Sequence, residues 1–252
     1  MKFAIIAAGE GSRLRAEGIE APKPLVQIGG ECLIDRLIRI FLHHQPDEVV
    51  VICNDLTGLV ADHLSRLQRD GLDGQRVPLR VVVKSTPSSM HSFFELSPYL
   101  ADGPFILTTV DTIFRESEFA DYVAAFRQTP ADALMGVTDY IEDERPLYVD
   151  VDDHLRVCGF LDDTPTTYIS AGIYGLKPVA LQTLSDCMAR GQQRMRNFQR
   201  ALLTDGRDVR AWAFSKVLDI DHASDIQRAS AMINEKYKKP RISHDILGSV
   251  SN

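Results

Sequence analysis

The chain has 252 residues, 44% of them hydrophobic and 25% charged, so it is long enough to bury a core without disulfides or structural metals. Its formal net charge of -7 at pH 7 argues against a nucleic-acid partner, because proteins that bind the phosphate backbone usually carry a basic face. Its apolar runs fall short of the about 18 residues that a membrane span needs, and the N-terminal run is too short for a signal peptide. We therefore expect a cytoplasmic protein with no membrane partner.

Strand and helix patterns alternate through the first half of the chain. The predicted strands are short apolar runs at 3–8, 48–53, 79–84 and 104–110. The predicted helices show apolar residues at helical spacing and lie at 33–44, 57–68 and 91–100. Because the strands are apolar at nearly every position, they are typical of parallel strands that are buried on both faces. The pattern predicts an α/β fold, a Rossmann-like three-layer α/β/α arrangement around a mostly parallel, mixed sheet.

The second half has a different texture, with short strands that follow one another closely. We expect these strands at 131–137, 147–151, 155–161, 168–176 and 208–214. Helices are expected at 178–190, at 194–204 and from about 224 to 238. The strands read as antiparallel or mixed additions to the same sheet. The "DVDD" stretch at 150–153 lies between two of them and is interpreted as a hairpin turn rather than a metal motif.

The stretch "AAGEGSRLRAEGIEAPKP" follows the first strand and carries the strongest chemical signal. Gly9 and Gly11 lack β-carbons, so backbone N–H groups there can approach an anion closely, and Ser12 adds a hydroxyl donor. Arg13 offers a planar fork that matches phosphate oxygens, and Lys23 adds a charge between two stiffening prolines. Ligands of open α/β sheets bind beyond the carboxyl ends of strands, so this turn predicts a polyphosphate site.

Other phosphate motifs fit this turn less well. A dinucleotide-binding turn needs a third glycine at the position where Leu14 stands, and a P-loop needs a glycine-lysine pair that is absent from the sequence. The remaining alternative is a glycine-rich turn without function, with Lys23 as a solvated surface lysine. The combination of GxGSR with PKP at this spacing is more specific than a lone GxG, and it favours the phosphate interpretation.

The stretch "GEGSRLRAEGIEAPKPLVQIGGECLIDRLI" resembles the signature of the sugar-phosphate nucleotidyltransferases, also called nucleoside-diphosphate-sugar pyrophosphorylases. The resemblance implies a glycosyltransferase-A-type fold in one domain over 1–238, with a nucleotide lobe at about 1–110, an acceptor lobe at about 111–215 and a polar tail at 239–252. It also implies attack of an acceptor phosphate on the α-phosphorus of an NTP, with release of pyrophosphate. A homodimer is a possibility, since dimers are common in the family.

A Mg²⁺ ion is implied as cofactor, because the reaction brings two anions together and Mg²⁺ prefers carboxylate, phosphate and water oxygens. Asp111 follows the strand at 104–110 and matches the family's metal aspartate. Asp219 matches a second metal ligand, and Asp221 stands where many relatives have glycine and some cytidylyltransferases have an acid. The alternatives are a turn cap for Asp111, a helix cap for Asp221, and a simple first-turn acid for Asp225.

Recognition of the base and of the acceptor is less well marked. The resemblance assigns the base to the stretch "KSTPSSMHSFF", where Ser89 is our choice, together with the turn that starts at Ala8. On the acceptor side, Gly172 would let a ligand approach and Tyr174 would line the pocket. Many hexose-phosphate enzymes carry an "EKP"-like segment upstream, whereas this chain has "LDDTPTT" at 161–167, which weakens the case for a standard hexose contact.

These features predict an Mg²⁺-dependent nucleotidyltransferase. In this interpretation Arg13 neutralises the departing pyrophosphate, and Lys23 holds the α-phosphate and the acceptor phosphate together. The expected acceptor is a sugar 1-phosphate, and the alternative is a CTP-dependent enzyme that acts on a small phospho-alcohol such as phosphocholine. A third possibility is a nucleotide-sugar-binding regulator without turnover, but such relatives usually lose the lysine or a metal aspartate, and this chain keeps them. A glycosyltransferase would need a functional D-x-D and would not need GxGSR.

Overall fold

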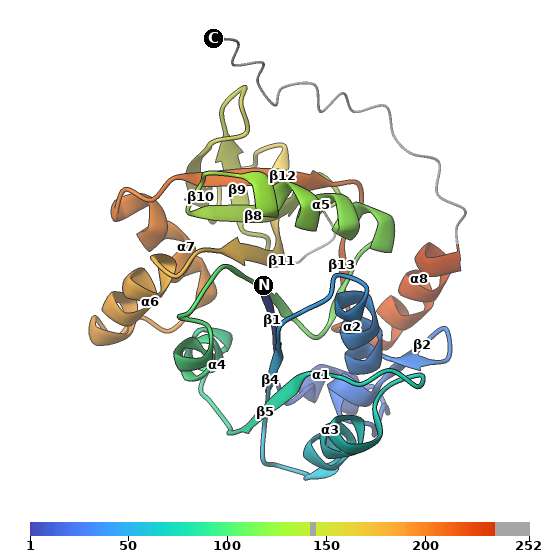
Figure 1. Ribbon diagram of the computed structural model, residues 1–252. Coiled ribbons are helices and arrows are strands. Elements are labelled where there is room, and N and C mark those ends of the chain that lie inside the picture. The colour runs from blue at the N-terminus through green and yellow to red at the C-terminus, as the bar shows by residue number, and fades with distance from the viewer. Residues whose placement is uncertain (142–144, 235–252) are drawn as a thin grey trace.

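The computed structural model describes residues 1–141 and 145–234, and shows a nine-stranded mixed sheet with helices on both faces (Figure 1). The predicted three-layer α/β/α architecture is confirmed. Among the helices of these described residues, none has the length and apolar character that crossing a bilayer requires. The end of the last predicted helix and the predicted polar tail at 239–252 lie outside the described residues.

Parallel strands make up one half of the sheet. They are β1 (Lys2–Ala7), β4 (Val49–Cys53), β5 (Leu79–Val83) and β6 (Phe105–Thr109). β1 pairs with β4 on one side and with β6 on the other, and β5 forms the edge beyond β4. Parallel pairing brings the carboxyl ends of β1, β4 and β6 to the same edge of the sheet, so the loops that follow them converge there.

The other half of the sheet is mostly antiparallel, as the sequence predicts. Its strands are β8 (Ala133–Thr138), β9 (Tyr148–Val151), β10 (Val157–Leu161), β11 (Tyr168–Leu176) and β12 (Val209–Phe214). β11 pairs antiparallel with β6, β8 and β9, and β12 pairs parallel with β8. A single sheet therefore runs without interruption from the first half of the chain into the second.

The "DVDD" stretch ends β9 and begins the turn to β10, its antiparallel neighbour. Asp152 Oδ1 accepts hydrogen bonds from the backbone N–H groups of His154 and Arg156, each at 2.9 Å. An aspartate that bonds the backbone ahead of it in this way is typical of a turn residue. The interpretation of this stretch as a hairpin turn is confirmed.

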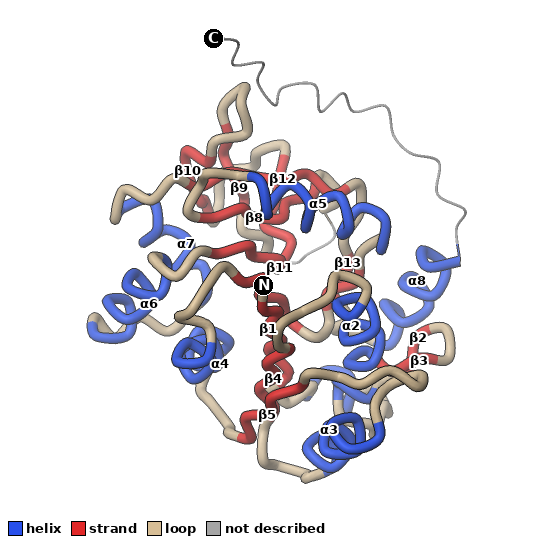
Figure 2. Tube along the Cα trace, in the orientation of Figure 1, coloured by secondary structure: helices blue, strands red, loops and turns tan. Residues whose placement is uncertain are grey.

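Helices cover the two faces of the sheet over two separate hydrophobic clusters (Figure 2). One face carries α2 (Leu33–Leu42), α3 (Leu59–Asp70), α5 (Glu116–Gln128) and α8 (Ala223–Asn234). The other carries α4 (Ser89–Leu96), α6 (Ala180–Ala189) and α7 (Met195–Thr204). β1 serves both clusters, because successive side chains of a strand point to opposite faces. Phe3 and Ile5 accordingly belong to one cluster, and Ala4 and Ile6 to the other.

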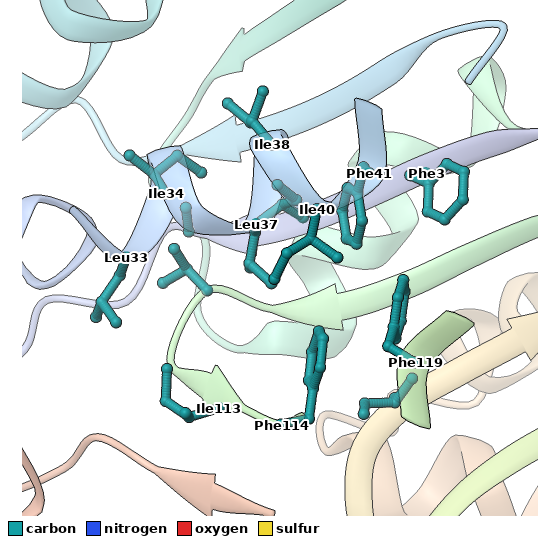
Figure 3. Packing of buried hydrophobic residues seen from close by; sticks show 14 of the residues in the cluster. Phe3, Leu33, Ile34, Leu37, Ile38, Ile40, Phe41, Ile113, Phe114 and Phe119 are labelled. Carbon is teal, nitrogen blue, oxygen red and sulfur yellow. The ribbon is translucent and has the colours of Figure 1, made fainter. Parts of the chain in front are cut away.

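The apolar face of α2 shows how the helices attach (Figure 3). Leu37 and Phe41 are one turn apart and fully buried, and the ring of Phe41 stacks on Phe3 of β1 with centroids 4.6 Å apart. Phe119 of α5 packs against Phe41 and stacks on Phe114 at 4.6 Å. Each fully buried phenylalanine of this kind contributes about 1.5–3 kcal/mol. This face of the sheet therefore holds both α2 and α5 in place.

Several short elements were not among the predictions. They are α1 (Ser12–Ala16), the 3-10 helix η1 (Lys23–Leu25), the hairpin β2 (Gln27–Ile28) with β3 (Glu31–Cys32), and the pair β7 (Thr112–Ile113) with β13 (Leu218–Asp219). The 3-10 helix η2 (Ser97–Tyr99) falls within the helix predicted at 91–100. Elements of two to five residues are too short to show a hydrophobic period. The β7–β13 pair matters for function, because it holds the stretch after Asp111 against the stretch that carries Asp219 and Asp221.

Candidate active site

The glycine turn joins β1 to α1 and lies against Lys23. Gly11 precedes α1 with φ 63, a left-handed conformation that favours glycine, and a β-carbon there would lie 3.1 Å from Cβ of Lys23. Glycine at this position therefore permits both the backbone conformation and the close approach to Lys23. Gly9 differs, since a β-carbon at that position would meet nothing within 4 Å.

Lys23 is the centre of the site. It begins η1, the residue is 9% exposed, and its Nζ donates hydrogen bonds to Asp111 and, at 2.8 Å, to Asp221. Burial would lower the pKa of Lys23, but the two carboxylates outweigh burial and raise the pKa above its ordinary value. The lysine is therefore a fixed positive charge, and it is not the solvated surface residue of the alternative interpretation.

The two carboxylates come from distant parts of the chain. Asp111 follows β6, and Asp221 lies between β13 and α8, 198 positions after Lys23. Burial would raise the pKa of Asp111, but the Lys23 ammonium holds that pKa below its usual value. Asp221 also accepts a hydrogen bond from Arg13 Nη1 at 3.0 Å. Arg13, Asp221, Lys23 and Asp111 therefore form one continuous ionic cluster.

Asp225, rather than Asp221, caps α8. Oδ2 of Asp225 accepts hydrogen bonds from the backbone N–H groups of Asp221 at 2.9 Å and His222 at 2.7 Å. The expectation that Asp225 is an acid of the first helical turn is confirmed, and the alternative that made Asp221 the cap is wrong. Because Asp225 accepts hydrogen bonds from the N–H groups just before the helix, the carboxylate of Asp221 is available to Lys23 and Arg13.

A first cavity of about 470 Å³ opens between the glycine turn and the N-terminus of α4. It brings together every residue expected to bind the nucleotide, namely Ala8, Gly9, Gly11, Ser12 and Ser89. The ionic cluster forms part of the same wall, through Arg13, Lys23, Asp111 and Asp221. Glycines, hydroxyls and paired charges therefore face one another across a single space, which is the chemical character that a polyphosphate needs.

Residues that the sequence reasoning missed complete this cavity. Thr86 and Ser92 line it and share a hydrogen bond of 2.6 Å between their hydroxyls. Asn54, the residue after β4, donates from Nδ2 to the backbone carbonyls of Ala8 at 3.2 Å and Gly9 at 3.3 Å, and so braces the glycine turn. The rule that places ligands beyond the carboxyl ends of strands could have pointed to Asn54, because β4 is the parallel neighbour of β1.

A second cavity, of about 380 Å³, lies on the other side of the Arg13–Asp221 ion pair, and these two residues line both cavities. Asp219 lines the second cavity, and the residues around the first do not include it. Asp219 and Asp221 were expected to face one ion together. In the structure Asp221 lines both cavities and Asp219 lines only the second of the two. Asp219 ends the short strand β13, and Asp221 lies beyond it.

The two residues chosen for the acceptor pocket need correction. Gly172 has φ 70 at an irregularity in β11, and a β-carbon there would lie 3.1 Å from Oγ1 of Thr112, so packing explains the glycine. Tyr174 is buried, accepts a hydrogen bond from Gln199 Nε2 at 3.2 Å, and burial raises its pKa to about 12. Neither lines either of the two cavities, whereas the nearby Ser170 of β11 lines the second.

The carboxylates of Asp111 and Asp221 are the groups best placed to hold a metal. Both line the first cavity, and both already bind the same ammonium group, so their oxygens converge on one point. Over residues 1–141 and 145–234, no group of three or more His, Cys, Asp or Glu side chains is arranged to hold a metal ion. The residues present therefore fit Mg²⁺ only as an ion that keeps few protein ligands and takes phosphate oxygens and water as the others.

The chain is similar in sequence to known nucleotidyltransferases. The chain is 22% identical over 249 residues to the UTP–glucose-1-phosphate uridylyltransferase AglF of Haloferax volcanii, covering 94% of this chain and 98% of that protein. It is 24% identical over 212 residues to the low-salt glycan biosynthesis nucleotidyltransferase Agl11 of the same organism, covering 82% of this chain and 58% of that protein. The chain therefore spans little more than half of the second relative.

Two solved structures have the same fold. One is a Bacillus anthracis protein described as a glucose-1-phosphate thymidylyltransferase, with a TM-score of 0.80, 19% identity and coverage of 95% of this chain and 98% of that chain. The other is the inositol-1-phosphate CTP transferase from T. maritima, with a TM-score of 0.74, 18% identity and coverage of 92% and 97%. A family model matches residues 3–203, which include the glycine turn, Lys23 and Asp111. The chain belongs to the family of proteins with a MobA-like NTP transferase domain.

Proposed function

We propose that this nucleotidyltransferase transfers a nucleoside monophosphate from an NTP to a sugar 1-phosphate and releases pyrophosphate. The observation that carries the proposal is the placement of Lys23, buried beside the glycine turn and bonded to Asp111 and Asp221 in a cavity large enough for a nucleotide. A lysine held in this way is a fixed charge at the place where a phosphate would enter. Family membership supports the reaction class, and the substrates are part of the proposal.

The glycine turn is proposed to receive the β- and γ-phosphates. Gly9 faces open space, so a phosphate can reach its backbone without meeting a β-carbon, and Ser12 adds a hydroxyl at the start of α1. Arg13 lines both cavities and would neutralise the charge that grows on the departing pyrophosphate. Once they face the phosphates, donors of this kind stabilise the charge that develops in the transition state.

Lys23 is proposed to hold the α-phosphate and the acceptor phosphate near each other. Two anions must meet for the transfer, so catalysis consists mostly of positioning and neutralisation. The raised pKa of Lys23 keeps the lysine charged at every pH near neutrality. No side chain is needed as a general base, because the acceptor phosphate is already an anion.

Mg²⁺ is the proposed cofactor, with Asp111 and Asp221 as the residues that would hold it and Asp219 as a third acid on the side of the second cavity. When bound, the ion would supply positive charge against the phosphate oxygens. Lys23 and Arg13 occupy these carboxylates in the structure, so both side chains would turn from the acids toward the phosphates when nucleotide and metal enter.

The second cavity is the proposed acceptor site. Arg145 and Ser170 line it together with the shared Arg13, so it offers donors to a phosphorylated molecule next to the place where the α-phosphate would lie. Asp162, in the stretch that replaces the "EKP" segment, forms ion pairs with Arg196 at 2.5 Å and Arg200 at 2.7 Å. The carboxylate of Asp162, which stands in place of the family's sugar-binding glutamate, is therefore already engaged by two arginines.

The alternative remains a CTP-dependent enzyme for a small phospho-alcohol, and the engagement of Asp162 and the acid at Asp221 favour it. One contact argues against phosphocholine among these acceptors. Lys216 Nζ lies 4.2 Å from the ring centroid of Tyr140, which is an aromatic residue of the second cavity. A lysine already occupies this cation–π contact, so it would repel the quaternary ammonium of choline.

A pyrophosphate-release screen tests the proposal. Each of the four NTPs is combined with Mg²⁺ and with a panel of sugar 1-phosphates and phospho-alcohols that includes glucose 1-phosphate, inositol 1-phosphate and phosphocholine. We expect release with at least one sugar 1-phosphate and little with phosphocholine. Release with inositol 1-phosphate and CTP alone would support the alternative. Nucleotide binding without release from any pair would contradict both and would favour the non-catalytic regulator.

A further inference from the structure

The segment that carries Asp221 is fastened to α1 at two points one helical turn apart. Arg13 on α1 binds the side chain of Asp221 at 3.0 Å. Glu17, which directly follows α1, binds Nδ1 of His222 through Oε1 at 2.5 Å and accepts the backbone N–H of Ala223 through Oε2 at 2.7 Å. Arg13 and Glu17, which lie one helical turn apart, therefore hold the three consecutive residues 221–223, more than two hundred positions further along the chain.

The contact of Glu17 is a helix cap supplied from another part of the chain. The first N–H groups of a helix have no partner inside the helix, and side-chain oxygens usually satisfy them. Asp225 accepts from the N–H groups of Asp221 and His222, which lie just before α8, and Glu17 accepts from that of Ala223, the first residue of α8. Both carboxylates therefore fix the backbone on which the side chain of Asp221 stands.

The position of Asp221 depends on that backbone. Its two oxygens reach Lys23 and Arg13 separately, Oδ1 at 2.8 Å and Oδ2 at 3.0 Å, so a shift of the segment would break one contact or the other. Glu17 itself is absent from the residues around both cavities, although it lies beside the ionic cluster. Its effect on the site must therefore pass through the segment that it holds.

We propose that Glu17 is a positioning residue that holds Asp221 in register with Lys23 and so couples the glycine turn to the acidic segment. The expected effect of Glu17 on turnover rests on the proposed function, whereas its hold on the backbone of residues 221–223 does not. Glu17 lies between GxGSR and PKP, a place where the signature motif demands no acid, so this contact is an assignment from the structure. A purely structural role, in which Glu17 only stabilises α8, is the competing explanation.

Amide hydrogen exchange separates the two explanations without any substrate. The variant is Glu17→Ala, and the control is Glu20→Ala, which removes an equal charge from an exposed side chain of the same loop. We expect exchange in Glu17→Ala to be faster by about tenfold at the backbone N–H groups of Asp221, His222 and Ala223, because the whole segment loosens. Faster exchange at Ala223 alone would show a local cap and would overturn the proposal.

Turnover of the active NTP and acceptor pair gives the second test. Glu17→Ala should lower kcat by about ten- to hundredfold, because small misplacements at an active site have effects of that size. In an Asp221→Asn background the same change should lower kcat no further, since Glu17 acts through Asp221. Glu17→Gln keeps an acceptor for Ala223 and should lie between the wild type and Glu17→Ala.

The outcomes of these tests distinguish this inference from the proposed function. Equal losses of kcat in the wild-type and Asp221→Asn backgrounds, or a lower Tm with unchanged kcat, would overturn the positioning role and leave the nucleotidyltransferase intact. A wild-type protein that releases no pyrophosphate would remove the proposed function. The exchange measurement would then still decide whether Glu17 holds the segment of Asp221.

Discussion

The two cavities share the Arg13–Asp221 wall, yet the chain builds them in different ways. The first is formed chiefly by two short stretches, the glycine turn at 8–14 and the loop and helix start at 86–92, with glycines and hydroxyls as its main groups. The second is formed by side chains from β8, β11, β13 and α8 and the segments beside them, and arginines and aspartates are prominent among them. A local motif can specify the glycine turn of the first cavity, whereas the second cavity exists only once distant strands have paired.

This difference suggests a division of work. A nucleotide's phosphates are the same in every member of a nucleotidyltransferase family, so a backbone-rich cradle of fixed geometry serves all of them. An acceptor differs from enzyme to enzyme, and side chains on separate elements can change one at a time. We therefore expect substitutions in the first cavity to affect every acceptor alike, and substitutions in the second to change the choice of acceptor.

The largest effect is expected at the shared centre. Lys23→Ala or Asp111→Asn should lower the rate of pyrophosphate release by at least about 10²–10³, the loss seen when one preorganised donor is removed from a transition state. The control is Arg15→Ala, which removes an exposed cation of α1 that lines neither cavity. Lys23→Ala also leaves Asp111 without its ammonium partner, so Lys23→Arg, which keeps the charge, should accompany it. Turnover near the wild-type rate in both variants would refute the assigned roles.

The next prediction tests the separation of the two cavities. Ser89→Ala should raise KM for the NTP and leave KM for the acceptor unchanged, because Ser89 lines the first cavity. Arg145→Ala should raise KM for the acceptor and leave KM for the NTP unchanged, because Arg145 lines the second cavity. A hydrogen bond to a charged group contributes about 1.5–3 kcal/mol, so the loss at Arg145 should be roughly tenfold or more. Parallel changes of both KM values in both variants would mean that the cavities do not divide the substrates as proposed.

The neighbouring glycines of the first cavity allow a finer comparison. Gly11→Ala should destabilise the protein by about 1–2 kcal/mol, the cost of a left-handed conformation for a residue with a β-carbon. Its β-carbon would also lie 3.1 Å from Cβ of Lys23. Gly9→Ala should leave the free energy of unfolding nearly unchanged and weaken NTP binding, because its β-carbon would enter open space on the ligand side. Urea denaturation and KM for the NTP measure the two effects. Equal stability losses would contradict the distinction.

The smallest expected effect is that of pH on stability. Acid should weaken the contacts of the first cavity, and alkali should weaken those beside the second. The pKa of Asp111 is held down by Lys23, so its stabilising contribution is present above the ordinary value of about 3.9 and is lost as pH falls. The pKa of His222, beside the second cavity, is raised by its hydrogen bond to Glu17. Its contribution is therefore complete below the ordinary value of about 6.5 and is lost as pH rises through the raised pKa.

Thermal unfolding from pH 6 to pH 9 checks the alkaline side. The Tm of the wild type should fall slightly across this range relative to that of His222→Ala, in which the titrating group is absent. The difference between the two proteins should be greatest at pH 6 and should vanish at pH 9. A constant difference across the range would show that the contact between Glu17 and His222 does not depend on the charge of the imidazole.

Much of the fold could be predicted because its elements are long enough to show a period. β1 and β4 are apolar at nearly every position, and α2 repeats its apolar residues every third or fourth position, so both kinds of element were recognisable. The hairpin of β2 and β3 and the pair of β7 and β13 have two residues per strand, and no pattern can mark them. The last of these sets the position of Asp219.

Within the site, the predicted residues that the structure brings together in the first cavity are mostly set by local chemistry. Gly11, Ser12 and Arg13 are adjacent, and the turn that contains them must bring their backbone and side chains to one place. Tyr174, by contrast, lines neither cavity. The register of β11 shifts between Ser170 and Tyr174, so the alternation of side chains along the strand could not show which of them face a cavity. Ser92 and Thr86 were missed because their hydroxyls meet only through the fold of the loop before α4.

The sequence by itself determined an alternating α/β chain with a glycine turn and adjacent cations after its first strand, because hydrophobic period, glycine conformations and neighbouring charges are properties of short stretches. Tertiary structure alone decided that Asp221 rather than Asp219 binds Lys23 and that Glu17 reaches the same segment. Contacts between residues about two hundred positions apart depend on which strands pair and in what register, and those choices are made by burial of the whole sheet rather than by any local pattern.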